Sequence, residues 1–524
     1  MGGQSIPKFD YDLAPYVSKT FITNICEYLD DNEVDEKIIG DIKEQIELIY
    51  EKSNSLMNEN TLKIIEDIIQ ESLDNNSIIP SNCINKAIKK TDRATYQAME
   101  ALIHNLNTMA CRAGAQVPFS SVNFGTDTSP EGRMIIKNFL LALDAGLGEG
   151  ETPIFPISIF KLKSGISYNP EDPNYDLFKL ACKVSAKRLF PNFSNIDAPY
   201  NLAFYKENNP DTEIAYMGCR TRTISNINDL DNQIVTGRGN LSFTSINLPR
   251  LAIEAKGDID KFYQSLDKIM EIVKNQLLHR YKIQCNKTLK NFPFLMGQGV
   301  WIYSDQLGVN DTLEQVYKHG TLSIGFIGLA ETLKALIGKH HGESETAQKL
   351  GLEIITHMRN YVDKMSKQYS LNFTLLATPA EGLSGRFVKM DKKRFGIIEG
   401  VTDRDYYTNS THVPVYYPIS AYKKIQIEAP YQALCNAGHI CYVELDGDPT
   451  ENMDAFESVI RCMHDEGIGY GAVNHPVDRD PICGYVGIIG DTCPCCGRHE
   501  GEALTPEVYR NIIAKNRLGG IYGK

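Results

Sequence analysis

The stretch Glu213-Ile-Ala-Tyr-Met-Gly-Cys-Arg-Thr-Arg222 places a lone cysteine directly after an apolar run and a glycine. Ile214 to Met217 has the composition of a strand, and Gly218 favours a tight turn. The sequence therefore predicts a strand that ends in a turn with the Cys219 thiol at its tip. Such a thiol suits nucleophilic chemistry, or one-electron chemistry in which a thiyl radical takes a hydrogen atom from carbon. The alternative is a small buried hydrophobe, the usual role of a free cysteine.

Outward from this stretch, predicted strands and helices alternate along the chain. Strands are expected at 112–125, 152–161, 241–249 and 291–299 and at the starts of 322–336 and 372–386. Helices are expected at 91–111, 133–145, 177–184 and 250–280. This alternation is typical of an α/β fold. Residues 34–75 instead carry isoleucine and leucine at helical spacing, which predicts two surface helices.

Composition limits the class of protein. The chain has 524 residues, 42% of them hydrophobic and 23% charged, as in a soluble globular protein. The net charge of −12 argues against a general nucleic-acid surface but allows a local basic site for a phosphorylated small molecule. No apolar run reaches the length of a membrane span, and no signal peptide precedes the 13 cysteines. We therefore expect a cytoplasmic protein with reduced thiols, without membrane or nucleic-acid partners.

Two further stretches suggest binding sites. Residues 378–386, Thr-Pro-Ala-Glu-Gly-Leu-Ser-Gly-Arg, follow a predicted strand and predict a loop of small residues whose N–H groups can approach an anion. An ordinary turn is the alternative. Residues 406–414 are polar and aromatic and are expected to line a pocket. His340 and His341 are adjacent, point in different directions and are not expected to bind a metal.

A cysteine cluster near the C-terminus has the spacing of a metal site. Cys493-x-x-Cys496 resembles one knuckle of a zinc ribbon, and Asp480-x-x-Cys483 resembles a second in which a carboxylate replaces a thiol. The expected zinc ligands are Cys483, Cys493 and Cys496, with Asp480 or Cys495 as the fourth. A degenerate ribbon that no longer holds metal is the alternative.

Several stretches together resemble the catalytic subunit of anaerobic (class III) ribonucleoside-triphosphate reductases, which are glycyl-radical enzymes. They are 112–119, 217–220, 237–250, 378–386, 406–410 and the cysteine knuckles. The resemblance implies a ten-stranded α/β barrel with a finger loop and a C-terminal zinc ribbon. It divides the chain into an N-terminal helical part (1–90), a catalytic barrel (91–470), a zinc-ribbon region (471–500) and a tail for the glycyl radical (501–524).

The resemblance also implies chemistry, namely reduction of ribonucleoside triphosphates for DNA synthesis. Cys219 matches the thiyl residue that abstracts the ribose 3′ hydrogen, and Asn240 matches an asparagine near the ribose. Gly520 is the candidate radical glycine, generated by a separate iron–sulfur activase with S-adenosylmethionine. Formate is the implied reductant, and zinc is structural. The candidate substrate-binding residues are Thr378, Glu381, Gly382, Ser384, Gly385, Arg386, Tyr406 and Asn409.

The resemblance implies partners as well: the activase, ribonucleoside triphosphates, ATP and deoxynucleotide effectors, and a second copy of the chain. The sequence departs from the family pattern in three ways. The chain is expected to begin after the ATP-cone and the first barrel strand with a second active-site cysteine that family members carry, Asp480 replaces a cysteine, and 517–522 only approximates the radical-glycine motif. The alternatives are an inactive or split reductase that acts through a partner chain, and another glycyl-radical enzyme. A formate-lyase-like acyltransferase would carry a Cys-Cys pair where Cys219 stands alone.

Overall fold

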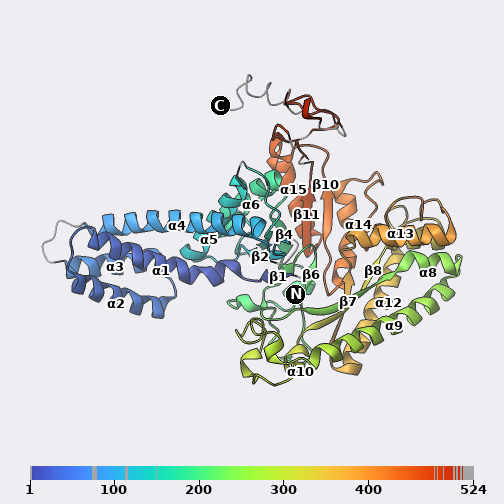
Figure 1. Ribbon diagram of the computed structural model, residues 1–524, viewed down its shortest axis with the longest axis horizontal. Helices are drawn as coiled ribbons and strands as arrows, with labels where there is room; N and C mark the ends of the chain where they lie inside the picture. Colours follow the sequence, from blue (N-terminus) through green and yellow to red (C-terminus); the bar gives the residue numbers. More distant parts are fainter. Residues whose placement is uncertain are drawn as a thin grey trace.

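Two sheets organise the computed structural model (Figure 1), which describes residues 3–73, 79–111, 116–148, 150–476, 478–480, 482–487, 489–499, 502, 505–507 and 510. One sheet has six strands in the order β1-β2-β3-β4-β11-β10, and the other has three in the order β7-β8-β9. The strands are β1 (Gln4–Ile6), β2 (Ser120–Phe124), β3 (Ile157–Leu162), β4 (Asn192–Asn195), β7 (Asn240–Asn247), β8 (Thr321–Ile327), β9 (Asn372–Ala377), β10 (Cys441–Glu444) and β11 (Tyr470–Asn474).

Most neighbouring strands run parallel, and a single bridge connects the two sheets among the described residues. Strands β1 to β4 run parallel, β11 is antiparallel to β4, and β10 is parallel to β11. The second sheet is parallel throughout, and a parallel bridge from Leu376 to Gly438 joins β9 to the residues before β10. The α/β class is therefore confirmed. The described residues form two adjoining sheets, and a closed ten-stranded barrel stays a prediction.

Helices cover both sheets and make their central strands fully buried. The first sheet packs against α5 (Pro130–Ala145), α6 (Tyr175–Arg188) and α15 (Met453–Asp465), and the second against α8 (Leu248–Ala255), α9 (Ile259–Cys285), α11 (Leu329–Ile337) and α12 (Glu345–Tyr369). Helices α13 (Glu381–Phe395) and α14 (Ala421–Leu434) follow β9. Strands β3, β8 and β9 are buried along their whole length, as expected for parallel strands covered on both faces.

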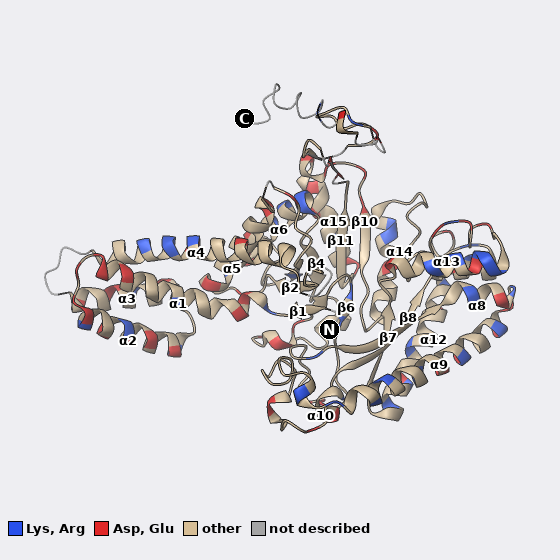
Figure 2. Cartoon of the chain, viewed as in Figure 1, with Lys and Arg blue, Asp and Glu red and all other residues tan. Residues whose placement is uncertain are grey.

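An elongated helical arm projects from the first sheet (Figure 1). It contains α1 (Phe9–Asp30), α2 (Glu36–Ser53), α3 (Glu59–Ser72) and α4 (Pro80–Thr108). Helices α2 and α3 confirm the two predicted surface helices, with charged residues on their outer faces (Figure 2). Helix α4 begins well before the predicted Thr91, because Pro80 suits a first helical turn and Cys83 and Ala87 continue the buried stripe. Among the described residues, no helix has both the length and the apolarity to cross a bilayer.

Other predicted elements were wrong in type or extent. Of the described part of the strand expected at 112–125, only β2 at Ser120–Phe124 is a strand. The helix expected at 250–280 is two helices, α8 and α9, separated where Lys256 and Gly257 have φ angles of 54° and 83°. The strand expected at 291–299 is a series of turns after η2 (Leu289–Asn291), whose apolar side chains join a separate small cluster. The loop expected at 378–386 ends at Ala380, because residues 381 onward form α13.

Candidate active site

The predicted strand, turn and thiol form a β-hairpin. Strands β5 (Tyr216–Met217) and β6 (Thr221–Arg222) pair antiparallel, and Gly218, Cys219 and Arg220 make the turn between them. Gly218 has a φ of 62°, so a glycine suits this position. Cys219 lies at the tip and is partly exposed. The hairpin packs in an apolar cluster with side chains from the first sheet and from segments beside its strands: Phe155, Ile157, Ile159, Ile196, Ile214, Tyr216, Ile224, Ile440, Tyr470 and Ala472.

Polar side chains of the first sheet hold one edge of the hairpin. Asn123 Oδ1 accepts from the Tyr216 N–H at 2.8 Å, and Asn123 Nδ2 donates to the Tyr216 carbonyl at 2.9 Å. Ser5 Oγ donates to the same carbonyl at 2.8 Å, and Ser121 Oγ accepts from the Gly218 N–H at 2.8 Å. Side chains thus replace a neighbouring strand as hydrogen-bond partners of this buried backbone, which fixes the hairpin against β1 and β2.

The other edge rests on the segment where the two sheets adjoin. The Arg222 N–H donates to the Ala437 carbonyl at 2.9 Å, and the Arg222 guanidinium donates to Asn201 Oδ1 and the Asn436 carbonyl. Gly438 has a φ of 130°, and a Cβ there would lie 1.7 Å from the Arg220 carbonyl oxygen. The turn that carries Cys219 therefore has room for no side chain at Gly438.

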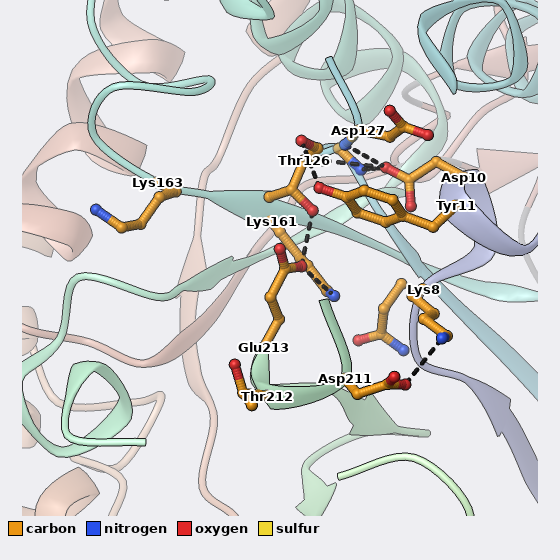
Figure 3. Close-up of polar contacts among 12 residues, drawn as sticks. Lys8, Asp10, Tyr11, Thr126, Asp127, Lys161, Lys163, Asp211, Thr212 and Glu213 are labelled. Atoms are coloured by element: carbon orange, nitrogen blue, oxygen red, sulfur yellow. Dashed lines mark hydrogen bonds and ion pairs between the residues drawn. The ribbon is translucent and has the colours of Figure 1, made fainter. Parts of the chain in front are cut away.

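A buried ion pair anchors the chain that leads into the hairpin (Figure 3). Lys161 Nζ lies 2.8 Å from Glu213 Oε2, and their side chains are 0% and 3% exposed. Thr126 Oγ1 donates to the same carboxylate oxygen at 2.7 Å. Nearby, Lys8 Nζ lies 2.8 Å from Asp211 Oδ1. Because a buried charge is costly without its partner, Glu213 is held firmly to β3.

The start of α1 is tied to the same region (Figure 3). Asp10 Oδ2 accepts from the N–H groups of Gly125, Thr126 and Asp127 at 2.8, 3.0 and 3.1 Å, and the Tyr11 hydroxyl donates to the Thr126 carbonyl at 2.9 Å. Burial, reinforced by the charge of Asp10, raises the pKa of Asp127 to about 6. These contacts join the first helix to the exit of β2 and so to the base of the hairpin.

The environment of Cys219 favours a thiol over a thiolate. Burial raises the pKa of Cys219 above its ordinary value, and the carboxylate of Glu381 acts in the same direction. The charge of Arg220 and a hydrogen bond with Tyr442 oppose the increase without cancelling it. Cys219 therefore keeps its hydrogen at neutral pH. That state suits hydrogen-atom transfer, whereas a nucleophilic cysteine needs a lowered pKa.

Two loops lie beside the hairpin turn. Arg220 Nη1 lies 3.4 Å from the Thr378 carbonyl and 3.4 Å from Ser410 Oγ. The Ala380 N–H donates to Asn409 Oδ1 at 3.1 Å, which joins the two loops. Helix α13 begins immediately afterwards without a side-chain cap. The Leu383 N–H donates to the Ala380 carbonyl at 2.7 Å, and the N–H groups of Glu381 and Gly382 are available to an anion. The structure thus brings Cys219, Thr378, Glu381 and Asn409 into one region.

Asn240 begins a row of polar side chains across the second sheet. Its Nδ2 donates to Thr321 Oγ1 at 3.0 Å and to Ser323 Oγ, which in turn bonds to Thr374 Oγ1 at 2.8 Å. These three hydroxyl residues were not predicted from the sequence. Their signal is a Thr or Ser at alternate positions of otherwise apolar strands, which also fits ordinary sheet packing.

The remaining candidate substrate residues lie further out or serve α13 itself. Gly382 and Arg386 are exposed, and Tyr406 is 46% exposed. Ser384 is buried, and its Oγ donates to the Glu381 carbonyl at 2.7 Å. Gly385 packs near the Asp405 carbonyl, where a Cβ would lie 3.3 Å away. Gly520 and the rest of 517–522, with 112–115, lie outside the described residues.

Tyr442 and Tyr470 are neighbours of Cys219 that the sequence analysis did not identify. Tyr442 lies close enough to Cys219 to act against the increase in the pKa of its thiol, and the Tyr470 hydroxyl donates to the Gly218 carbonyl at 3.3 Å. The Tyr470 ring stacks on Tyr216, with 4.3 Å between centroids. Both tyrosines come from strands about 220 to 250 residues later in the chain, so no local pattern relates them to the cysteine.

The cysteine cluster brings together the four predicted donors. Ligand atoms of Asp480, Cys483, Cys493 and Cys496 all lie within 4.8 Å of one another. Asp480 Oδ2 accepts from Arg498 Nε at 2.8 Å, the kind of outer contact that orients a ligating carboxylate. Cys495 is exposed. Three thiols and a carboxylate fit a tetrahedral divalent metal, with Asp480 rather than Cys495 as the fourth donor.

Comparison with known proteins identifies the family. A family model described as anaerobic ribonucleoside-triphosphate reductase matches residues 1–513. The enzyme of that name from Escherichia coli (strain K12) is 34% identical over 428 residues, covering 80% of this chain and 58% of the relative. The one from Enterobacteria phage T4 is 32% identical over 438 residues, covering 81% and 69%. The chain thus spans about 58% of the length of the bacterial relative.

Solved structures support the fold. An anaerobic ribonucleotide reductase superposes with a TM-score of 0.56 at 16% identity, covering 92% of this chain and 73% of that one. The Thermotoga maritima enzyme with dATP in its specificity site gives a TM-score of 0.56 at 18% identity, covering 88% and 74%. Together with the match over residues 1–513, these findings show that the chain belongs to the anaerobic ribonucleoside-triphosphate reductase family.

Proposed function

We propose that this chain reduces ribonucleoside triphosphates to deoxyribonucleoside triphosphates for DNA synthesis, by glycyl and thiyl radical chemistry in an anaerobic cytoplasm. The observation that carries the proposal is the state of Cys219. Its thiol lies at the tip of a hairpin held on both edges, burial raises its pKa, and the chain belongs to the reductase family. A thiyl radical at Cys219 takes the hydrogen from C3′ of the ribose, which activates the neighbouring C2′–OH for loss.

The substrate lies between the hairpin and the second sheet in this proposal. Asn240 and the hydroxyl groups bonded to it, Thr321 and Ser323, support the ribose. The triphosphate binds where α13 begins, with Thr378, Glu381 and Asn409 at its inner side. The backbone of Gly382, Ser384 and Gly385 belongs to the first turns of that helix, and Arg386 and Tyr406 lie at the outer rim.

The radical and the electrons come from outside the described residues. In this proposal Gly520 stores the radical, which a separate iron–sulfur activase generates with S-adenosylmethionine, and formate is the reductant. Asp480, Cys483, Cys493 and Cys496 hold a structural zinc ion that fixes the segment leading to the C-terminal tail. In this proposal residues 1–90 are the N-terminal helical part, 91–470 the catalytic barrel, 471–500 the zinc-ribbon region and 501–524 the tail that carries the glycyl radical.

Effectors and assembly belong to the proposal as well. The Thermotoga maritima enzyme has been solved with dATP bound in its specificity site and in complex with dATP and CTP. By analogy, this chain takes ribonucleoside triphosphates as substrates, ATP and deoxynucleotides as effectors, and a second copy of itself as partner.

Electron paramagnetic resonance and product analysis test the proposal together. The purified chain is incubated anaerobically with activase, reductant and S-adenosylmethionine, beside a Gly520→Ala variant. A glycyl doublet that is absent from the variant, with deoxynucleotide formed by the wild type, is the expected result. A doublet without product would favour a chain that works only with a partner. The absence of both would contradict the proposal.

A further inference from the structure

Arg220 is a buried cation next to Cys219 without an anionic partner. The residue is 2% exposed, and among the described residues no carboxylate oxygen lies within 4.0 Å of its guanidinium. Its contacts are long: 3.4 Å to the Thr378 carbonyl and Ser410 Oγ and 3.5 Å to the Ala377 carbonyl. These lie beyond the usual 2.7–3.2 Å range. Nε has no hydrogen-bond partner at all.

Nearby charged groups do not compensate Arg220. The buried carboxylate of Glu428 is already occupied by Lys424 Nζ at 3.1 Å and His412 Nδ1 at 3.0 Å. His412 and His439 are neutral, since burial lowers the pKa of each and the charge of Arg220 lowers it further. The neighbouring Tyr442 hydroxyl is uncharged because burial raises its pKa. The protein thus maintains a buried positive charge without a counter-charge close to it, which is energetically unfavourable.

Arg222, two residues along the same hairpin, likewise has no carboxylate oxygen within 4.0 Å among the described residues, but it makes a closer hydrogen bond than Arg220 does. It is also buried, at 4% exposed, but its guanidinium donates to Asn201 Oδ1 and the Asn436 carbonyl and lies 5.1 Å from the centre of the Tyr200 ring. Arg222 therefore has a structural role that its contacts explain. The contacts of Arg220 explain no comparable role.

We infer that Arg220 binds an oxyanion beside Cys219. The guanidinium reaches the backbone immediately before α13, whose uncapped first turn adds N–H donors and a positive end. Two reactants of the proposed function carry this chemistry: a phosphate group of the ribonucleoside triphosphate and the carboxylate of formate. The identity of the anion rests on the proposed function, whereas the existence of the site rests on Arg220 and α13.

The test measures how anions protect Cys219 from alkylation, and it needs no activase. The full chain is treated with iodoacetamide, and modification of Cys219 is quantified by peptide mass spectrometry in sodium formate, inorganic tripolyphosphate, CTP or cytidine. Sodium chloride at equal ionic strength is the control for non-specific anion effects. Protection by formate alone assigns the site to the carboxylate, and protection by tripolyphosphate and CTP assigns it to the phosphate. Either result supports the inference.

Variants at the two arginines decide the outcome. Arg220→Gln is expected to weaken protection about 10- to 100-fold, the usual effect of losing a charged hydrogen bond, and Arg220→Lys is expected to weaken it less. Arg222→Lys is the matched control and should keep the wild-type protection constant. Arg220→Gln should not lower the thermal midpoint, because it removes an unpaired buried charge.

The inference would be overturned by no protection by any of these anions, by protection no better than in chloride, or by protection that survives Arg220→Gln. A large loss of thermal stability in Arg220→Gln would also do so, since it would show a structural role. A failure of the proposed reductase function would give a different experimental result from a failure of this inference. The wild type would then form no deoxynucleotide after activation, while protection by an anion still depended on Arg220.

Discussion

Gly438→Ala tests whether the turn that carries Cys219 is held by close backbone packing. An alanine Cβ would meet the Arg220 carbonyl oxygen at 1.7 Å, the Arg220 carbonyl carbon at 2.7 Å and the Thr221 Cα at 3.0 Å. Contacts under 3.0 Å essentially never occur for a real Cβ, so the turn must move by about 1.3 Å. All these obstacles are backbone atoms, and no side-chain rotation relieves them.

The shift of the turn that carries Cys219 determines how far the rate of deoxynucleotide formation should fall. A shift of about 1 Å in a reacting group costs roughly 100-fold in rate, so deoxynucleotide formation per glycyl radical should fall at least ~100-fold. The φ of 130° at Gly438 adds about 1–3 kcal/mol of backbone strain for alanine. The free energy of unfolding should therefore fall by at least that amount, measured by urea denaturation at neutral pH.

Gly467→Ala is the matched control for this prediction. Gly467 also has a positive φ, 78°, but a Cβ there meets no atom within 4 Å. Gly467→Ala should lower the free energy of unfolding through backbone strain and leave deoxynucleotide formation per glycyl radical unchanged. Wild-type product formation in Gly438→Ala would refute the reasoning, and so would equal losses in both variants, because strain alone would then account for the effect.

Four further predictions follow from the same contacts. Glu213→Gln leaves Lys161 buried without its counter-charge and should lower the free energy of unfolding, measured in urea, by about 3–5 kcal/mol. Glu47→Gln is the control, because Glu47 pairs with Lys43 on the surface, and it should change that free energy by under about 1 kcal/mol. Folding raises the pKa of Asp127 from 3.8 to about 6, so the folded state holds this proton more tightly than the unfolded state does. The stability that this group contributes is therefore lost as the pH rises from about 4 to 6. Asp127→Asn should flatten the pH dependence of the urea midpoint over that range. Alkylation of Cys219 should still accelerate above pH 9, because burial raises its pKa above 9.0, and a plateau reached by pH 8 would contradict the thiol state. Cys493→Ser should lower bound zinc, measured by atomic emission, at least about 10-fold relative to the exposed Cys495→Ser.

Local chemistry explains what the sequence could predict. Gly218 after an apolar run predicts a turn with Cys219 at its tip, because few other residues adopt its φ of 62°. Isoleucine spacing predicts α2 and α3, and Cys-x-x-Cys spacing predicts a convergent cluster. These features depend on neighbours within one turn or one knuckle.

Features that depend on distant residues could not be predicted. The partners of the hairpin come from β1, β2 and the segment at 436–438, and Tyr442 reaches Cys219 from β10. The stretch 291–299 is apolar enough for a strand, but its side chains find burial in a local cluster rather than in a sheet. The start of α13 at Glu381 was missed because Gly382 and Gly385 suggest a loop, whereas packing of Ser384 and Val388 keeps them helical.

The most direct test of the account compares Cys219→Ser with the wild type. Both chains are activated anaerobically, the glycyl signal is quantified by electron paramagnetic resonance, and deoxynucleotide formed per glycyl radical is measured by chromatography. We expect the same glycyl signal in both chains and, in the variant, no deoxynucleotide above the unactivated background. Product formation by Cys219→Ser at the wild-type rate would contradict the central claim that this thiol takes the hydrogen atom from the substrate.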